Sequence, residues 1–272
     1  MTAMKKKLIL IVLALLGISS FAQDYRTITE IPYISSGEKD PYRKERCKLD
    51  ICYPTGVKDF KTVVWYHGGG LTGGEKRFRE ELMNQGFAVV AVNYRLYGKG
   101  ARNPDYTVDA AESLAWVFRH ISEYGGNPGK IYVAGHSAGA YLTLMLALDK
   151  SWLGAHGIDA DSVRWYFPIG GQTTTHCTIR EEMGLPMFEE IPIIDRYAPL
   201  NNARKLGTRM TLITADPKME LLARYEENLY LKAILEGVGN DEIPLYRMEG
   251  YDHVEAAHPA CMLISRLVNA DE

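Results

Sequence analysis

The sequence lacks the features that mark nucleic-acid-binding and membrane-spanning proteins. It has no run of lysines and arginines outside its first ten residues, and its formal net charge is −3, so no basic surface for nucleic acid is expected. The apolar run from Leu8 to Ile18 falls well short of the ~20 residues that cross a bilayer. The composition, 46% hydrophobic and 24% charged, instead indicates one ordinary globular domain.

Signatures of metal and cofactor binding are missing too. The histidines are scattered, and neither a His-Glu-x-x-His nor a Cys-x-x-Cys spacing occurs. Cys47, Cys52, Cys177 and Cys261 are too few for a disulfide framework in a chain of this length, which favours buried free thiols. We therefore expect any catalysis to need no metal and no cofactor.

The first 22 residues have the three parts of a secretory signal peptide. Lys5–Lys7 precede the apolar run, and Ser20 and Ala22 supply the small residues of a cleavage site after Ala22. A membrane anchor is the alternative, but the apolar run is too short for one. We expect residues 1–22 to be removed and the mature chain, residues 23–272, to be exported to the periplasm or beyond the cell.

Strand-like and helix-like segments alternate along the rest of the chain. Residues 27–35 and 43–53 are extended and are expected to pair antiparallel, whereas the later strands are unbroken apolar runs typical of a buried parallel sheet. The later strands are expected at 62–66, 87–93, 131–134, 165–169, 210–214 and 244–248. Helices are expected at 75–85, 107–124, 138–150, 219–236 and 255–268. The alternation predicts a three-layer α/β domain.

Ser137 is the candidate nucleophile. It lies in Gly135-His136-Ser137-Ala138-Gly139, between a buried strand and a helix. A strand that turns directly into a helix needs residues without bulk around the central one, and the turn pushes the serine out above the sheet. The five-residue pattern alone is weak, and its position between strand and helix strengthens it.

A glycine run earlier in the chain supports acyl transfer. His67-Gly68-Gly69-Gly70 follows the predicted strand 62–66, and its backbone could approach an oxyanion without side chains in the way. A flexible turn is the simpler alternative. A phosphate-binding loop is disfavoured, because the Gly-Lys-Ser/Thr ending and the G-x-G-x-x-G spacing are both missing.

A serine nucleophile needs a base, and the base needs an acid that orients it. In a fold of this kind the acid follows a late strand and the histidine follows the last one. Asp216 and His253 meet these conditions and are the predicted acid and base. Glu220 and Asp195 compete for the acid, but Glu220 is expected one turn into a helix. His258 competes with His253 but falls at the start of the last helix.

The sequence resembles the hormone-sensitive-lipase-like and BD-FAE-like branches of the α/β-hydrolase superfamily over roughly residues 43–268. The matching segments are 67–70, 93–96, 127–128, 131–139, Asp109, Asp216 and His253. The resemblance implies that Gly69, Gly70 and Ala138 donate backbone N–H groups to the oxyanion. It also implies that Tyr94, Arg95 and Asp109 brace the active-site loops.

Residues 171–207 interrupt the alternation of strands and helices and are expected to form a small cap or specificity insertion. His136, beside the nucleophile, and Gln172, His176 and Arg180, in this insertion, are candidate substrate-binding residues. The alternative is that the insertion is a solvated loop.

The expected function is that of a secreted serine carboxylic-ester hydrolase. It would act on short-chain or aromatic acyl esters, on carbohydrates or small molecules, through an acyl-enzyme. Two alternatives stay open: an amide hydrolase, such as an arylformamidase or peptidase with the same triad, and a binding protein on the hydrolase scaffold.

Overall fold

The computed structural model describes residues 23–186 and 191–272, so the predicted signal peptide lies outside the described residues. A nine-stranded sheet runs through the molecule in the order β1-β2-β4-β3-β5-β6-β8-β9, with β7 paired to β6. The strands are β1 (Tyr25–Pro32), β2 (Lys48–Pro54), β3 (Phe60–Tyr66), β4 (Ala88–Val92), β5 (Gly126–His136), β6 (Trp165–Ile169), β7 (Arg209–Met210), β8 (Leu212–Ala215) and β9 (Leu245–Met248).

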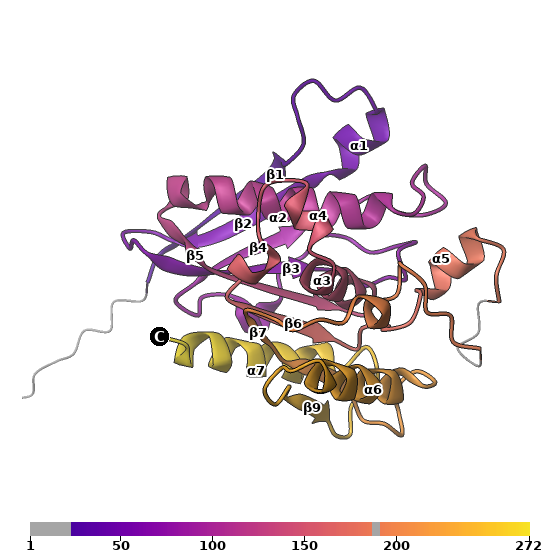
Figure 1. Cartoon of the computed structure of the whole chain (residues 1–272). Coiled ribbons are helices and arrows are strands. Elements are labelled where there is room, and N and C mark those ends of the chain that lie inside the picture. The colour runs from indigo at the N-terminus through magenta and orange to yellow at the C-terminus, as the bar shows by residue number, and fades with distance from the viewer. Residues whose placement is uncertain (1–22, 187–190) are drawn as a thin grey trace, which may run out of the picture.

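The helices cover both faces of this sheet (Figure 1). They are α1 (Pro41–Arg46), α2 (Asp105–Tyr124), α3 (Ala138–Leu148), α4 (Ser151–Gly154), α5 (Cys177–Glu182), α6 (Arg224–Gly237) and α7 (Ala257–Ala270), with 3-10 turns η1 (Glu80–Leu82), η2 (Ala160–Ser162) and η3 (Pro199–Asn202). β2 pairs antiparallel with β1 and β4, and the pairs from β3 onward are parallel. The prediction of antiparallel opening strands and a mostly parallel three-layer domain is confirmed.

Two hydrophobic clusters fill the layers on either side of the sheet. Val64 and Tyr66 of β3 belong to the cluster that contains the buried faces of α2 and α3. Their neighbours Val63 and Trp65 belong to the cluster that contains the buried face of α7. Successive side chains of a strand point to opposite faces, so one apolar run supplies both layers.

Three predicted boundaries are wrong, two because of side-chain contacts and one because of a backbone conformation. Residues 41–46 form α1, although a strand was expected from residue 43 onward. The Asp40 carboxylate accepts from the Tyr42 amide at 2.9 Å, and Pro41 suits a first helical turn. Residues 75–85 form no α-helix and contain only the 3-10 turn η1. There Oδ1 of Asn93 accepts a hydrogen bond from the Lys76 amide at 2.5 Å, which holds this stretch against the end of β4.

The third wrong boundary lies before α6, which begins at Arg224 and not at Met219. Ala223 has a φ of 59°, a left-handed conformation that interrupts a right-handed helix. Residues 216–223 therefore form a separate turn after β8, and this turn carries a residue of the candidate active site.

A buried ion pair joins α2 to the loop that follows β4. The Asp109 carboxylate accepts from Nε and Nη2 of Arg95, both at 2.8 Å, and from the Arg95 amide at 3.0 Å. Both residues are buried, and Asp109 is the nearest counter-charge of Arg95, which also pairs with Asp105 at 3.2 Å. This pair fixes the segment 93–96 against α2.

We predict that Asp109→Asn lowers the free energy of unfolding by about 3 kcal/mol, because it removes the buried counter-charge of Arg95 and leaves that guanidinium only the partly exposed Asp105, at 3.2 Å. Urea denaturation followed by circular dichroism measures the change. Glu249→Gln is the control, since Glu249 is 72% exposed in its pair with Arg247 and its loss should change stability by no more than about 0.5 kcal/mol. Equal unfolding midpoints for the two variants would contradict the structural role of Asp109.

Candidate active site

Ser137 stands in a strained turn between β5 and α3. Its φ of 55° and ψ of −116° lie outside the regions that non-glycine residues favour, so surrounding packing must hold it there. A Cβ on Gly135 would collide with the Gly139 carbonyl, and a Cβ on Gly139 would collide with the Tyr66 carbonyl. The predicted need for residues without bulk beside the serine is confirmed.

The loop after β9 brings His253 to this serine. Nε2 of His253 lies 2.9 Å from Oγ of Ser137, within hydrogen-bond distance. The elbow itself is tied to the neighbouring strand, because the Ser137 amide donates to the Ile169 carbonyl at 2.8 Å. The structure thus brings together the serine and the histidine that the sequence nominated.

Glu220, and not Asp216, is the carboxylate that contacts His253. Oε1 of Glu220 lies 2.5 Å from Nδ1 of His253, and the Glu220 side chain is 1% exposed. The two oxygens of Asp216 instead accept from the amides of Lys218, at 3.0 Å, and Gly250, at 2.9 Å. The prediction of Asp216 as the acid is corrected: Asp216 joins two loops, and Glu220 takes its place.

The turn after β8 explains the exchange. The Glu220 amide donates to the Asp216 carbonyl at 2.8 Å, which folds the chain back so that Glu220 returns to the strand end. Its carboxylate then accepts from the amides of Ala215, at 3.0 Å, and Leu221, at 2.8 Å. The sequence carried no clear signal for this turn, since residues 219–236 have the composition of one continuous helix.

The environment of Glu220 keeps its carboxyl group ionised. Burial raises the pKa of Glu220, but its hydrogen bond to His253, the charge on that ring and the two backbone amides outweigh burial, so the pKa lies below its ordinary value. An ionised Glu220 accepts a hydrogen bond from the Nδ1–H group of His253. The Nε2 lone pair is then free to accept a hydrogen bond from the Ser137 hydroxyl. The three side chains therefore have the arrangement that a general base requires.

Gly170 packs against His253, and no role for it was predicted from the sequence. A Cβ at this position would lie 3.0 Å from Cε1 of His253, and the residue has a φ of 58°. The buried Arg224 holds it in place by donating from Nη1 to the Gly170 carbonyl at 2.9 Å. A glycine directly after a parallel strand was the available signal.

The glycine run after β3 lies against the elbow. A Cβ on Gly68 would lie 3.3 Å from Cβ of Ser137, and Gly69 and Gly70 have φ values of 118° and 63°, which favour glycine. Ala138 is the first residue of α3, where backbone N–H groups have no partner within the helix. The predicted oxyanion donors Gly69, Gly70 and Ala138 thus belong to two backbone segments that meet beside Ser137.

Buried polar contacts hold this glycine run in position. The Tyr94 hydroxyl donates to the His67 carbonyl at 2.7 Å, and the two rings stack with centroids 4.4 Å apart. Arg46 donates from Nη2 to the Gly74 carbonyl at 2.5 Å and from Nε to the Tyr94 carbonyl at 3.0 Å. Burial lowers the pKa of His67 to about 4, so it packs there as a neutral ring.

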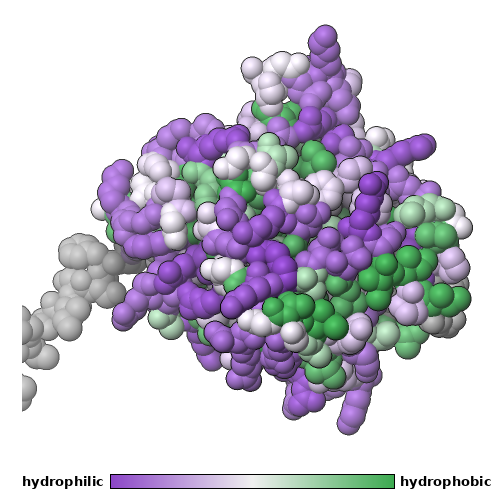
Figure 2. All heavy atoms as spheres, viewed as in Figure 1, coloured by the Kyte–Doolittle hydropathy of each residue, from purple (hydrophilic) through white to green (hydrophobic). Residues whose placement is uncertain are grey.

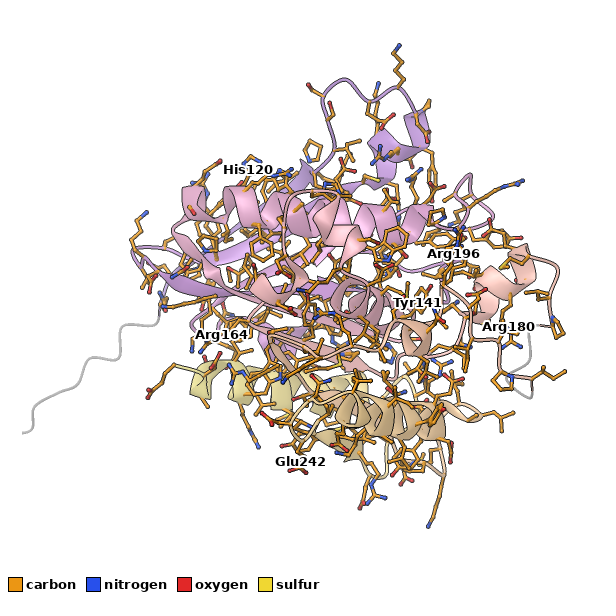
Figure 3. The ribbon with its side chains drawn as sticks, viewed as in Figure 1. His120, Tyr141, Arg164, Arg180, Arg196 and Glu242 are labelled. Carbon is orange, nitrogen blue, oxygen red and sulfur yellow. The ribbon has the colours of Figure 1, made fainter. Side chains whose placement is uncertain are left out.

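Residues 171–207 contain α5 and η3 and touch the glycine run, since the Thr178 hydroxyl donates to the Gly70 carbonyl. Three of the candidate substrate-binding residues in this segment are buried and serve its own structure. Gln172 accepts from the Cys177 amide at 3.0 Å, His176 accepts from the Thr178 amide at 3.2 Å, and Arg180 donates to the Pro186 carbonyl at 2.7 Å. Figure 3 labels Arg180 beside α5. These contacts assign Gln172, His176 and Arg180 to support of the segment and not to an exposed pocket wall.

The same segment exposes apolar side chains while it buries polar ones. Ile191 and Ile194 are 60% and 47% exposed. Outside the segment, Leu222, just before α6, is 66% exposed and Tyr230, in α6, is 53% exposed. Figure 2 shows apolar surface gathered on the side of the molecule where this segment and α6 lie. Sequence patterning fails here, because the usual distribution of polar and apolar residues is inverted.

Across residues 23–186 and 191–272, no group of three or more His, Cys, Asp or Glu side chains could hold a metal ion. Within the same ranges, no helix has both the length and the apolar character needed to cross a bilayer.

Comparison with known proteins agrees with this geometry. Residues 49–166 match the BD-FAE family model. The probable carboxylic ester hydrolase LipM of Mycobacterium tuberculosis is 43% identical over 88 residues, which is 30% of this chain and 20% of that protein. Carboxylesterase NlhH of the same species is 30% identical over 155 residues, which is 54% of this chain and 45% of that protein. The chain thus spans less than half the length of either relative.

Solved structures extend the similarity to nearly the whole fold. A truncated carbohydrate esterase from gut microbiota superposes with a TM-score of 0.73 at 15% identity, covering 92% of this chain and 97% of that one. A Pyrobaculum calidifontis esterase superposes with a TM-score of 0.65 at 22% identity, covering 91% and 85%. The chain has the α/β-hydrolase fold, and over residues 49–166 it is similar to the BD-FAE family.

Proposed function

We propose that this protein is a serine carboxylic-ester hydrolase that works through an acyl-enzyme. The observation that carries the proposal is the contact of His253 with Ser137 at 2.9 Å on one ring nitrogen and with Glu220 at 2.5 Å on the other. A serine, a histidine and a buried carboxylate in hydrogen-bond contact are the machinery of nucleophilic acyl transfer.

The reaction follows from these positions. Oγ of Ser137 attacks the ester carbonyl while Nε2 of His253 takes its proton, and the ionised Glu220 stabilises the imidazolium that forms. Gly69, Gly70 and Ala138 are proposed to donate N–H groups to the oxyanion of the tetrahedral intermediate. His253 then gives the proton to the leaving alcohol, and water repeats the sequence to release the acid.

Short-chain or aromatic acyl esters, on carbohydrates or small molecules, are the proposed substrates. Support comes from the similarity to a structure described as a carbohydrate esterase and to proteins named carboxylesterases. We also propose that the protein acts outside the cytoplasm, because its first 22 residues have the composition of a secretory signal.

A fluorophosphonate probe tests the nucleophile. We expect stoichiometric labelling of the wild-type protein at Ser137, mapped by peptide mass spectrometry, and no labelling of Ser137→Ala. In parallel, p-nitrophenyl acetate and butyrate should be hydrolysed far faster than p-nitroanilides of the same acids. Labelling that persists in Ser137→Ala would refute the assigned nucleophile, and preferential cleavage of the anilides would favour an amide hydrolase.

Paired variants test the acid. We expect Glu220→Gln to lower kcat by about 10³-fold to 10⁴-fold, because a neutral amide no longer fixes the His253 tautomer or stabilises its charge. Asp216→Asn should lower kcat less than about tenfold, since its effect is limited to two loop contacts. Steady-state hydrolysis of p-nitrophenyl acetate measures both, and a larger loss in Asp216→Asn would show that the two roles are reversed.

A further inference from the structure

A pocket opens beside the Ser137 elbow, on the side of the glycine run. Its volume is about 410 Å³. Its walls include Gly68, Arg77, Arg79, His136, Val254 and Ala257. The catalytic mechanism above uses none of these side chains.

The pocket is lined by neighbours of Ser137 and His253, the two groups that transfer the proton of the leaving alcohol. Gly68 packs against Ser137, and His136 precedes that serine in the chain. Val254 directly follows His253, and Nε2 of His136 lies 2.7 Å from the His253 carbonyl oxygen. The leaving oxygen must lie near His253 to receive its proton, so the alcohol part of an ester is the part that this pocket can reach.

The charges around the pocket are compensated except at one position. Arg79 pairs with Glu81 at 3.0 Å, and Glu75, which also lines the pocket, pairs with Arg46 at 2.6 Å. Arg77 is exposed and has no hydrogen-bond or ion-pair partner within residues 23–186 and 191–272. A planar guanidinium without a counter-charge is suited to a carboxylate, which it can bind through two parallel hydrogen bonds.

His136 offers a different contact in the same pocket. It donates from Nε2 to the His253 carbonyl, so Nδ1 is left as a hydrogen-bond acceptor. Burial, together with the nearby His253, lowers the pKa of His136 to about 4, so the ring is neutral near pH 7 and does not itself attract an anion. A hydroxyl group on the ligand could donate to it.

We propose that this pocket binds the alcohol part of the substrate and selects alcohols that carry a carboxylate, through Arg77. The inference rests on the proposed ester hydrolysis and deepens it by naming a substrate class. It predicts that esters of carboxylated alcohols, such as acidic sugars or hydroxybenzoates, are better substrates than their neutral counterparts.

Two matched esters test the selectivity: 3-acetoxybenzoate and 3-acetoxybenzamide, which share the acyl group and the position of the substituent. We expect kcat/KM of the wild-type protein to be about fivefold higher for the carboxylate at low salt. The preference should shrink in high salt, because an exposed ion pair is screened. Arg77→Gln should abolish the preference and leave hydrolysis of the benzamide ester unchanged.

Arg266→Gln is the matched control, because Arg266 is also exposed and lies far along α7 from the pocket. It should retain the wild-type ratio of the two substrates. Equal kcat/KM values for the two esters in the wild type, or a preference that survives Arg77→Gln, would overturn the inference while hydrolysis itself stands. Failure to hydrolyse either ester would refute the proposed function and this inference with it.

Discussion

The close approach of three backbone segments around Ser137 is the constraint on which the rest of the site depends. β3 and β5 are neighbours in the sheet, and α3 starts so near their ends that Gly139 packs against the Tyr66 carbonyl. Only glycines permit this distance, and the contact holds Ser137 in a conformation that it would not adopt alone. The serine, the glycine run after β3 and the first amide of α3 are thereby fixed relative to one another.

The loops that complete the site are positioned by buried polar contacts and not by the sheet alone. Arg46 and Tyr94 hold the glycine run, and the Arg95–Asp109 pair anchors the segment beneath it. On the other side, the partly exposed Asp216 connects the loops after β8 and β9, so that Glu220 and His253 lie together. Burial of the Arg95 and Asp109 charges costs free energy of desolvation, which their ion pair offsets in part.

How far the sequence predicts this molecule depends on how local each feature is. The elbow, the glycine run and His253 could be predicted, because each is a short pattern at the end of an apolar strand. Glu220 could not, because its place is set by the turn 216–223 and by the left-handed conformation of Ala223, which no residue preference indicates.

The substrate-binding residues predicted in the insertion 171–207 were misassigned for a related reason. Its polar residues Gln172, His176 and Arg180 were predicted to contact the substrate, but tertiary contacts bury them. The helix expected over residues 75–85 was displaced by the contact between Lys76 and Asn93, which lie 17 positions apart in the chain. Local propensity gives way wherever a distant side chain offers a backbone amide a better partner.

In the proposed mechanism Glu220, through His253, prepares Ser137 for attack. Proton NMR of the Nδ1 hydrogen of His253 tests this role of Glu220, because a short hydrogen bond to an ionised carboxylate moves this resonance far downfield. We expect a downfield resonance in the wild type that persists in Asp216→Asn and is lost or shifted upfield in Glu220→Gln. A resonance that survives in Glu220→Gln and disappears in Asp216→Asn would refute the role assigned to Glu220.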